Sequence, residues 1–152
     1  MSNKKTALIK RETAERILDE VIERAKEINA DDSYSCGIRE IRLFGSVLNT
    51  NKPMVGDLDL MVSCMYKKSP VDDHEFSKQL DQERAECKGY YIESLFYPYN
   101  RALKRLKNRS RTISIHDISE FDFAGVKIES KQVFENKDIG NYAKPFTKGH
   151  VE

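Results

Sequence analysis

The chain has 152 residues, of which 34% are charged and 39% hydrophobic, with 26 basic side chains against 25 acidic ones. This length suits one compact domain and leaves little room for a second core. The apolar runs are far shorter than the roughly 20 residues of a membrane span, and no apolar leader follows the first residues, so we expect a cytoplasmic protein with no membrane partner. The near-zero net charge excludes a globally basic nucleic-acid coat protein.

The first half of the chain predicts one helix followed by two strands. Apolar residues repeat with the 3.6-residue period of an amphipathic helix over 14–28. Residues 38–44 then form a short apolar run that ends at Gly45-Ser46, which indicates a strand leading into a glycine turn. Residues 57–64 alternate with a period of two, so Leu58 faces the core while Asp57 and Asp59 face the opposite way.

The second half predicts two more helices among further strands. Ser69 and Pro70 indicate a helix start and Gly89 a helix end, so we expect a helix over 70–88. The later elements are expected to be an aromatic strand over 90–97, a helix from Pro98 to about Asn108, a strand over 112–116 and one or two short strands within 125–134. This order predicts an α/β (α+β) domain over residues 1–134, with a mixed β-sheet and helices mainly on one face, and a C-terminal tail or strap over 135–152.

Cysteine and histidine residues are scattered along the chain. Cys36, Cys64 and Cys87 form no Cys-x-x-Cys pair, and the three histidines are equally far apart. Closed zinc sites and disulfide frameworks show regular spacings of these residues. We therefore expect reduced thiols and no transition metal.

Four residues carry the chemistry that the sequence suggests. Asp57 and Asp59 lie two positions apart on a predicted strand, so their carboxylates project from the same face and can share divalent cations. Gly45 lets the backbone approach a phosphate closely, and Ser46 adds a hydroxyl beside backbone N–H groups. A triphosphate bridged by Mg²⁺ would occupy both halves of such a site.

This pattern resembles the Gly-Ser-x-Asp-x-Asp signature of the DNA polymerase β-like nucleotidyltransferase superfamily, especially its minimal nucleotidyltransferases, over roughly residues 10–118. The resemblance implies a polymerase β palm-like fold and an enzyme that transfers a nucleoside monophosphate to a hydroxyl with release of pyrophosphate. Asp57 and Asp59 would bind two Mg²⁺ (or Mn²⁺) ions. Gly45 and Ser46 would hold the β- and γ-phosphates of a nucleoside triphosphate, with ATP as the first-choice donor. Many relatives have a glycine within five residues after the serine; here Asn49 or Asn51 is expected to take the left-handed turn.

The family's third carboxylate has two candidates in this chain. Glu93 stands in an apolar-acid-apolar run between the second and third predicted helices, which matches the family's order, so it is the first choice as metal ligand and proton acceptor. Asp117 is the rival. Ile113 and Ile115 share its face of the predicted strand, so a regular strand turns Asp117 toward the helices and away from Asp57.

A basic run over residues 101–111 follows the aromatic segment. It contains six Lys or Arg residues and no acid. Two interpretations stay open: a site for RNA, an acidic partner or the triphosphate, or a solvated helix face whose cations suit the helix dipole.

Several functions compete at this stage. The resemblance suggests a member of a toxin–antitoxin or defence pair that modifies a protein or an RNA. An antibiotic nucleotidyltransferase is an alternative; those enzymes usually carry an additional substrate-binding domain, and a homodimer could complete the pocket here. A third candidate is a catalytically degenerate binding module, and it gains if neither Glu93 nor Asp117 reaches a metal at Asp57 and Asp59. A fourth, an unrelated α/β interaction domain, predicts no ATP binding. The acceptor and the preferred base stay open.

Overall fold

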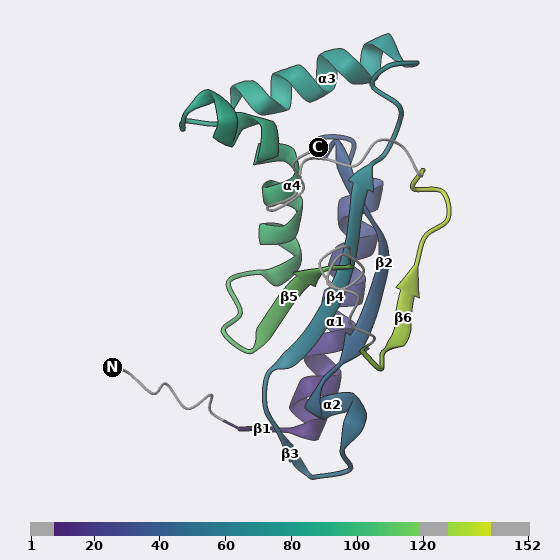
Figure 1. Ribbon diagram of the computed structural model, residues 1–152, viewed down its shortest axis with the longest axis vertical. Helices are drawn as coiled ribbons and strands as arrows, with labels where there is room; N and C mark the ends of the chain where they lie inside the picture. Colours follow the sequence, from purple (N-terminus) through teal and green to yellow (C-terminus); the bar gives the residue numbers. More distant parts are fainter. Residues whose placement is uncertain (1–7, 119–127, 141–152) are drawn as a thin grey trace.

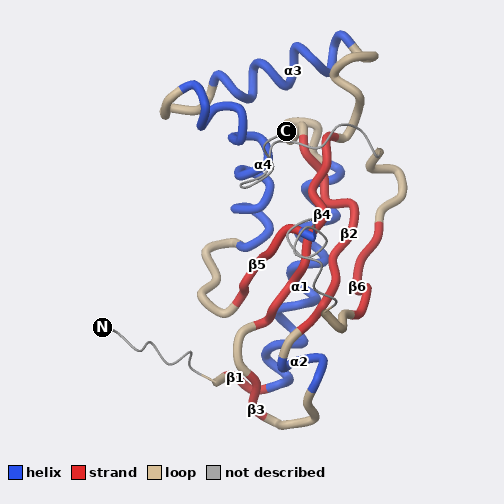
Figure 2. The backbone as a smooth tube through the Cα atoms, viewed as in Figure 1, coloured by secondary structure: helices blue, strands red, loops and turns tan. Residues whose placement is uncertain are grey.

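The computed structural model describes residues 8–118 and 128–140, which form a mixed α/β structure (Figures 1 and 2). The described elements are β1 (Ile9–Lys10), α1 (Arg11–Ala30), β2 (Cys36–Phe44), α2 (Ser46–Asn49), β3 (Met54–Val55), β4 (Leu58–Tyr66), α3 (His74–Ala85), α4 (Tyr91–Lys107), β5 (Ile113–Asp117) and β6 (Lys131–Glu135). The helix expected over 14–28 and the strands expected over 38–44, 57–64 and 112–116 are confirmed.

A four-stranded sheet in the order β5-β4-β2-β6 forms the centre of the molecule. Strand β2 pairs antiparallel with both β4 and β6, while β4 and β5 run parallel, so the sheet is mixed as predicted. Strands β1 and β3 form a separate two-stranded pair beside the start of α1. Since β4 and β5 run in the same direction, their first residues lie at the same end of the sheet.

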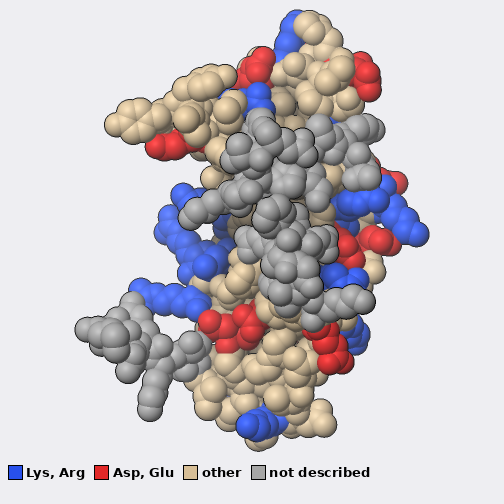
Figure 3. All heavy atoms as spheres, in the orientation of Figure 1, with Lys and Arg blue, Asp and Glu red and all other residues tan. Residues whose placement is uncertain are grey.

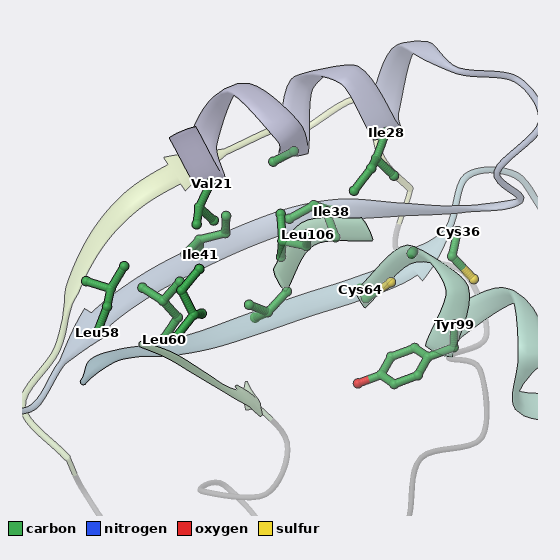
Figure 4. Packing of buried hydrophobic residues seen from close by; sticks show 14 of the residues in the cluster. Val21, Ile28, Cys36, Ile38, Ile41, Leu58, Leu60, Cys64, Tyr99 and Leu106 are labelled. Carbon is green, nitrogen blue, oxygen red and sulfur yellow. The ribbon is translucent and has the colours of Figure 1, made fainter. Parts of the chain in front are cut away.

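Helices α1 and α4 pack on the same face of this sheet. Figure 4 shows Val21 and Ile28 of α1 pointing toward Ile38 and Ile41 of β2, with Leu106 of α4 beside them. All five side chains are almost completely buried. Burying apolar side chains of this size stabilises a fold by about 1.5–3 kcal/mol each, so this layer supplies much of the core energy.

The strand expected over 90–97 is wrong, because these residues begin α4. Tyr99, Ala102 and Leu106 are buried and keep the 3.6-residue period of one helix face, which continues back through the aromatic segment. Pro98 lies inside the helix, where it removes one backbone hydrogen bond. Packing of the apolar face outweighs both this loss and the strand preference of aromatic residues. The helix ends as expected at Asn108, which takes the left-handed conformation.

Helix α3 is shorter than the predicted 70–88 helix. Asp73, not Ser69, is its N-cap: the carboxylate accepts a hydrogen bond from Phe76 N at 3.0 Å. Ser69 Oγ instead accepts from Asp72 N in the turn that precedes α3. A capping side chain can be assigned only once the direction of the chain is known, and this segment offers two candidates, Ser69 and Asp73.

The C-terminal part of the described chain runs along β2. Strand β6 fits the expectation of a strand within 125–134, although residues 119–127 lie outside the described ranges. After β6, Asn136 N donates to Arg39 O at 2.8 Å, and Ile139 is only 5% exposed. Residues 136–140 therefore pack against the domain; residues 141–152 of the expected tail lie outside the described ranges.

Candidate functional site

The turn that joins β2 to α2 is built on Gly45. Its backbone has φ of 79° and ψ of −156°, a region that essentially only glycine occupies. Ser46 follows as the first residue of α2, and its Oγ accepts a hydrogen bond from Gly56 N at 3.2 Å. This bond connects the turn to the chain that enters β4, one residue before Asp57.

Asp59 lies directly against this turn. Phe44 and Asp59 are paired across β2 and β4, so the residue after Phe44 meets the Asp59 side chain. A Cβ atom added to Gly45 would overlap Asp59 Oδ2 and lie 3.1 Å from its Cγ. The structure thus brings together the predicted residues Gly45, Ser46, Asp57 and Asp59 at the end of the sheet where β4 and β5 begin.

The two aspartates lie on the face of the sheet opposite α1 and α4. Leu58 and Leu60 are fully buried among the helices, so the alternating Asp57 and Asp59 project the other way, and both are partly exposed. This confirms the expectation drawn from the period of two. Side chains on one face at this spacing can share a cation.

Two residues of β5 belong to this site and were missed by the sequence analysis. The parallel register pairs Asp59 with Ser114 and Met61 with His116, so Ser114 and His116 share the face of Asp59. Ser114 Oγ and His116 Nε2 are 3.1 Å apart, and the His116 ring meets Phe44 edge-on with centroids 5.6 Å apart. The alternation of Ile113 and Ile115 contained this signal, but it was applied only to Asp117.

The site is electrostatically unfavourable for two carboxylates. Burial raises the pKa of Asp59, the charge of Asp57 raises this pKa further, and the charge of His116 lowers it. Oδ1 of Asp57 is buried and accepts no hydrogen bond from the described residues. An acceptor in this state costs free energy unless a cation or donor meets it.

Arg11 holds the loop between Ser46 and the aspartates. Its guanidinium donates to Val47 O at 2.8 Å, Thr50 O at 2.5 Å and Lys52 O at 2.9 Å. The expected left-handed turn at Asn49 or Asn51 is wrong: among the described residues, positive φ occurs only at Gly45, Asn108 and Arg109. Gly45 itself makes the sharp turn, and Arg11 satisfies the carbonyls that follow.

Glu93 does not lie on a strand beside Asp57 and Asp59. It is exposed in the first turn of α4, where its side chain folds back against Gly89. Helix α4 begins beside α3, at the opposite end of the molecule from the start of β4 (Figure 1). At 1.5 Å per residue, Glu93 is about 20 Å along the helix axis from Lys107, whose end of α4 leads back to the site.

Asp117 faces the helices, as the period of its strand predicted. It pairs with Val62, a core residue, and its Oδ2 accepts a hydrogen bond from Tyr99 OH of α4 at 2.5 Å. Neither candidate for the third carboxylate therefore shares the face of Asp57.

Two carboxylates remain as candidate cation ligands at this site. No group of three or more His, Cys, Asp or Glu side chains within residues 8–118 and 128–140 is arranged to hold a metal. Mg²⁺ is commonly bound by one or two carboxylates together with substrate phosphates. Asp57, with its unsatisfied Oδ1, and Asp59 are the two carboxylates that could hold such a cation here.

The predicted basic run divides into two groups. Arg101 donates to Glu83 at 3.0 Å and to Ser33 O, and its guanidinium lies 4.0 Å from the Tyr34 ring centroid. Arg105 pairs with Glu27 at 2.8 Å. The other four cations are the exposed residues Lys104, Lys107, Arg109 and Arg111. Figure 3 shows Lys and Arg gathered along α4 and the loop before β5, next to acidic side chains where β4 and β5 begin.

Comparison with known proteins identifies no relative: no family model, curated protein or solved structure matches this chain. Within the described residues, no helix is both long enough and apolar enough to cross a bilayer.

Proposed function

We propose that this protein is a metal-dependent nucleotidyltransferase that binds a nucleoside triphosphate, with ATP as first choice, at Gly45, Ser46, Asp57 and Asp59. The observation that carries the proposal is the contact between the Gly45 turn and Asp59, where a Cβ atom would overlap the carboxylate. A cation that bridges a phosphate and a carboxylate must touch both groups. The phosphate-binding turn and the two aspartates can therefore act on one ligand only if they lie as close together as Gly45 and Asp59 do.

Each residue has a role in this proposal. Gly45 and Ser46 would bind the β- and γ-phosphates through backbone N–H groups and the Ser46 hydroxyl. Asp57 and Asp59 would hold Mg²⁺ or Mn²⁺, which when bound neutralises phosphate charge and lowers the pKa of the acceptor hydroxyl. His116, on the same face, is a candidate to take up the acceptor proton, a role that the sequence analysis gave to Glu93. The acceptor oxygen would form a bond to the α-phosphorus, and pyrophosphate would leave.

A binding module without turnover is the second candidate. Neither Glu93 nor Asp117 lies beside Asp57 and Asp59, and within the described ranges no third acid completes the pair. A site with two carboxylates can hold Mg²⁺-ATP without activating an acceptor.

Labelled transfer distinguishes these candidates. Purified protein would be incubated with each α-labelled nucleoside triphosphate, Mg²⁺ or Mn²⁺ and cell extract, beside the Asp57→Asn/Asp59→Asn variant. Label on a macromolecule or small acceptor with the wild type alone supports transfer and identifies the acceptor class. If the wild type binds nucleotide in a metal-dependent way but transfers no label, the binding module is supported. If the wild type shows neither binding nor transfer, the nucleotidyltransferase proposal is contradicted.

A further inference from the structure

A groove of about 640 Å³ runs along the exposed side of α4. Its residues repeat at helical spacing, so they form one continuous stripe: Tyr97, Asn100, Lys104 and Lys107. Leu103 and Ile115 supply apolar surface beside the stripe, and Glu93 is the one acid among the groove's described lining residues. An apolar floor, an aromatic ring and amines in one groove suit a ligand with both flat apolar and anionic parts.

The three cations among the groove's described lining residues differ in whether the fold uses them. Arg101, which also lines it, is held by Glu83, and the neighbouring Arg105 by Glu27. By contrast, Lys104 and Lys107 are exposed, and no ion pair to them is found within residues 8–118 and 128–140. Their charge is therefore available to an anionic partner.

The basic segment 104–111 ends at the edge of the sheet, where β5 begins beside β4. After Lys107 the chain continues through the exposed Arg109 and Arg111 to Thr112, whose carbonyl accepts a hydrogen bond from Leu58 N at 2.7 Å. Leu58 lies between Asp57 and Asp59. A chain molecule that followed Lys104, Lys107, Arg109 and Arg111 would thus run from the groove to the edge strand β5.

Arg109 has an unusual backbone for a cation. Its φ is 60°, in the left-handed region that non-glycine residues seldom adopt. Glycine or asparagine would adopt this backbone conformation more easily than arginine. A change of Arg109 to glycine therefore removes the cation without straining the turn, which gives a clean test of its role.

We propose that the α4 groove and the basic segment 104–111 bind a single-stranded RNA, with its phosphates along the cations and a base on Tyr97. Repeated phosphates match a line of separated cations, and base stacking on aromatic rings is the usual contact of single strands with proteins. Binding of the strand stands on the groove alone.

The test uses a fluorescein-labelled 12-nucleotide oligouridylate and anisotropy titrations of the full chain between 50 and 200 mM KCl. Affinity is expected to fall with salt, with a log–log slope of about −2.8 if the four cations neutralise four phosphates at about −0.7 each. Lys104→Gln/Lys107→Gln is expected to lower affinity about tenfold and to reduce the slope by about 1.4. Arg109→Gly should reduce the slope by about 0.7.

Matched variants separate the groove from general charge. Lys78→Gln/Lys131→Gln removes the same charge from exposed positions on α3 and β6 and should bind as the wild type does. Tyr97→Leu should weaken binding at least about fivefold, whereas Tyr97→Phe should retain it. Equal weakening by both double variants, or a wild-type affinity that does not change with salt, would overturn the proposal.

Two further arms distinguish the partner and the proposed function. A 12-residue oligoglutamate that competes as well as the oligonucleotide would identify an acidic protein as the partner and overturn the RNA assignment. If the strand binds through α4 but the wild type transfers no label, the groove proposal stands and the proposed function fails.

Discussion

This protein contains two carboxylate sites that are satisfied in opposite ways. Glu83 of α3 has a side chain only 3% exposed, yet it accepts hydrogen bonds from Ser35 N at 2.9 Å and from Arg101 at 3.0 Å. Burial alone would lower the pKa of Arg101, but the hydrogen bond and charge of Glu83 raise it overall. At the other end of the sheet, Asp57 Oδ1 is buried without a partner among the described residues and the pKa of Asp59 is raised.

The difference supports a structural role for Glu83 and is the basis of the binding role that we propose for Asp57 and Asp59. Glu83 joins α3, α4 and the chain before β2, so its charge is compensated within the fold. Among the described residues, Asp57 and Asp59 are placed together without a cation equivalent to Arg101, which costs stability, and in the proposed function a ligand supplies the missing charge. Residues that destabilise a fold on their own are typical of active sites.

The largest effect is expected at Glu83. Glu83→Ala leaves Ser35 N and the Arg101 guanidinium without their acceptor, and breaking such a buried pair should lower the free energy of unfolding by about 3 kcal/mol. Urea unfolding measures this directly. Asp81→Ala is the control on the same helix: its contact with Arg84 is 3.8 Å long and its side chain 74% exposed, so its loss should cost less than about 0.5 kcal/mol. Similar losses of unfolding free energy in Glu83→Ala and Asp81→Ala would show that Glu83 has no special structural role.

Gly45→Ala is expected to have an intermediate effect. The substitution strains a glycine-only backbone conformation, at a cost of about 1–3 kcal/mol, and pushes Asp59 out of place. Both stability in urea and binding of Mg²⁺-ATP should fall. Gly56→Ala provides the control, since its added methyl group would meet only Ser46 Oγ at 3.7 Å. In the double variant Gly45→Ala/Asp59→Ala, part of the loss in stability should be recovered; strict additivity would show that the two residues do not touch.

Asp59→Asn should have the smallest effect, and one of opposite sign. The pKa of Asp59 is raised in the folded state, so the folded protein holds this proton more tightly than the unfolded chain does. At a pH above the pKa that Asp59 has in the unfolded chain, ionisation of Asp59 therefore lowers the free energy of unfolding. Removing the charge should raise Tm at pH 7 by less than about 2–4 °C, the shift that corresponds to about 1 kcal/mol, because solvent screens this partly exposed carboxylate. This gain in Tm should shrink as the pH falls and should vanish below the pKa that Asp59 has in the unfolded chain, where Asp59 is protonated in both states. A variant that is less stable at pH 7, or a gain that is independent of pH, would contradict this account.

The strands that carry the site were predictable because their signal is local. The alternation of Leu58 and Leu60 with the aspartates sets the face of β4, and the Gly45-Ser46 pair marks the end of β2. Helix α4 was not predictable in the same way. Tyr90, Tyr91 and Ile92 favour a strand locally, and they stay exposed, whereas the residues that decide for a helix lie further along the chain.

The error in α4 also explains why the third carboxylate was misplaced. Glu93 was assigned to a strand beside β4, and that assignment fails once its segment is helical. Only the parallel register of β4 and β5 brings Ser114 and His116 to the face of Asp59. Strand pairing is a long-range property, so a single sequence can indicate which face a residue shares but not which neighbour it meets.

The central claim is that Asp57 and Asp59 bind a cation only together with a nucleotide, and calorimetric titration tests it most directly. ATP would be titrated into the wild type in excess Mg²⁺ and again in EDTA, and Mg²⁺ alone would be titrated in a third experiment. We expect ATP to bind at least about tenfold more tightly with Mg²⁺, Mg²⁺ alone to bind weakly, and the Asp57→Asn/Asp59→Asn variant to lose the effect of Mg²⁺. Equal affinity for ATP in Mg²⁺ and in EDTA, or an unchanged Mg²⁺ effect in the variant, would contradict the account.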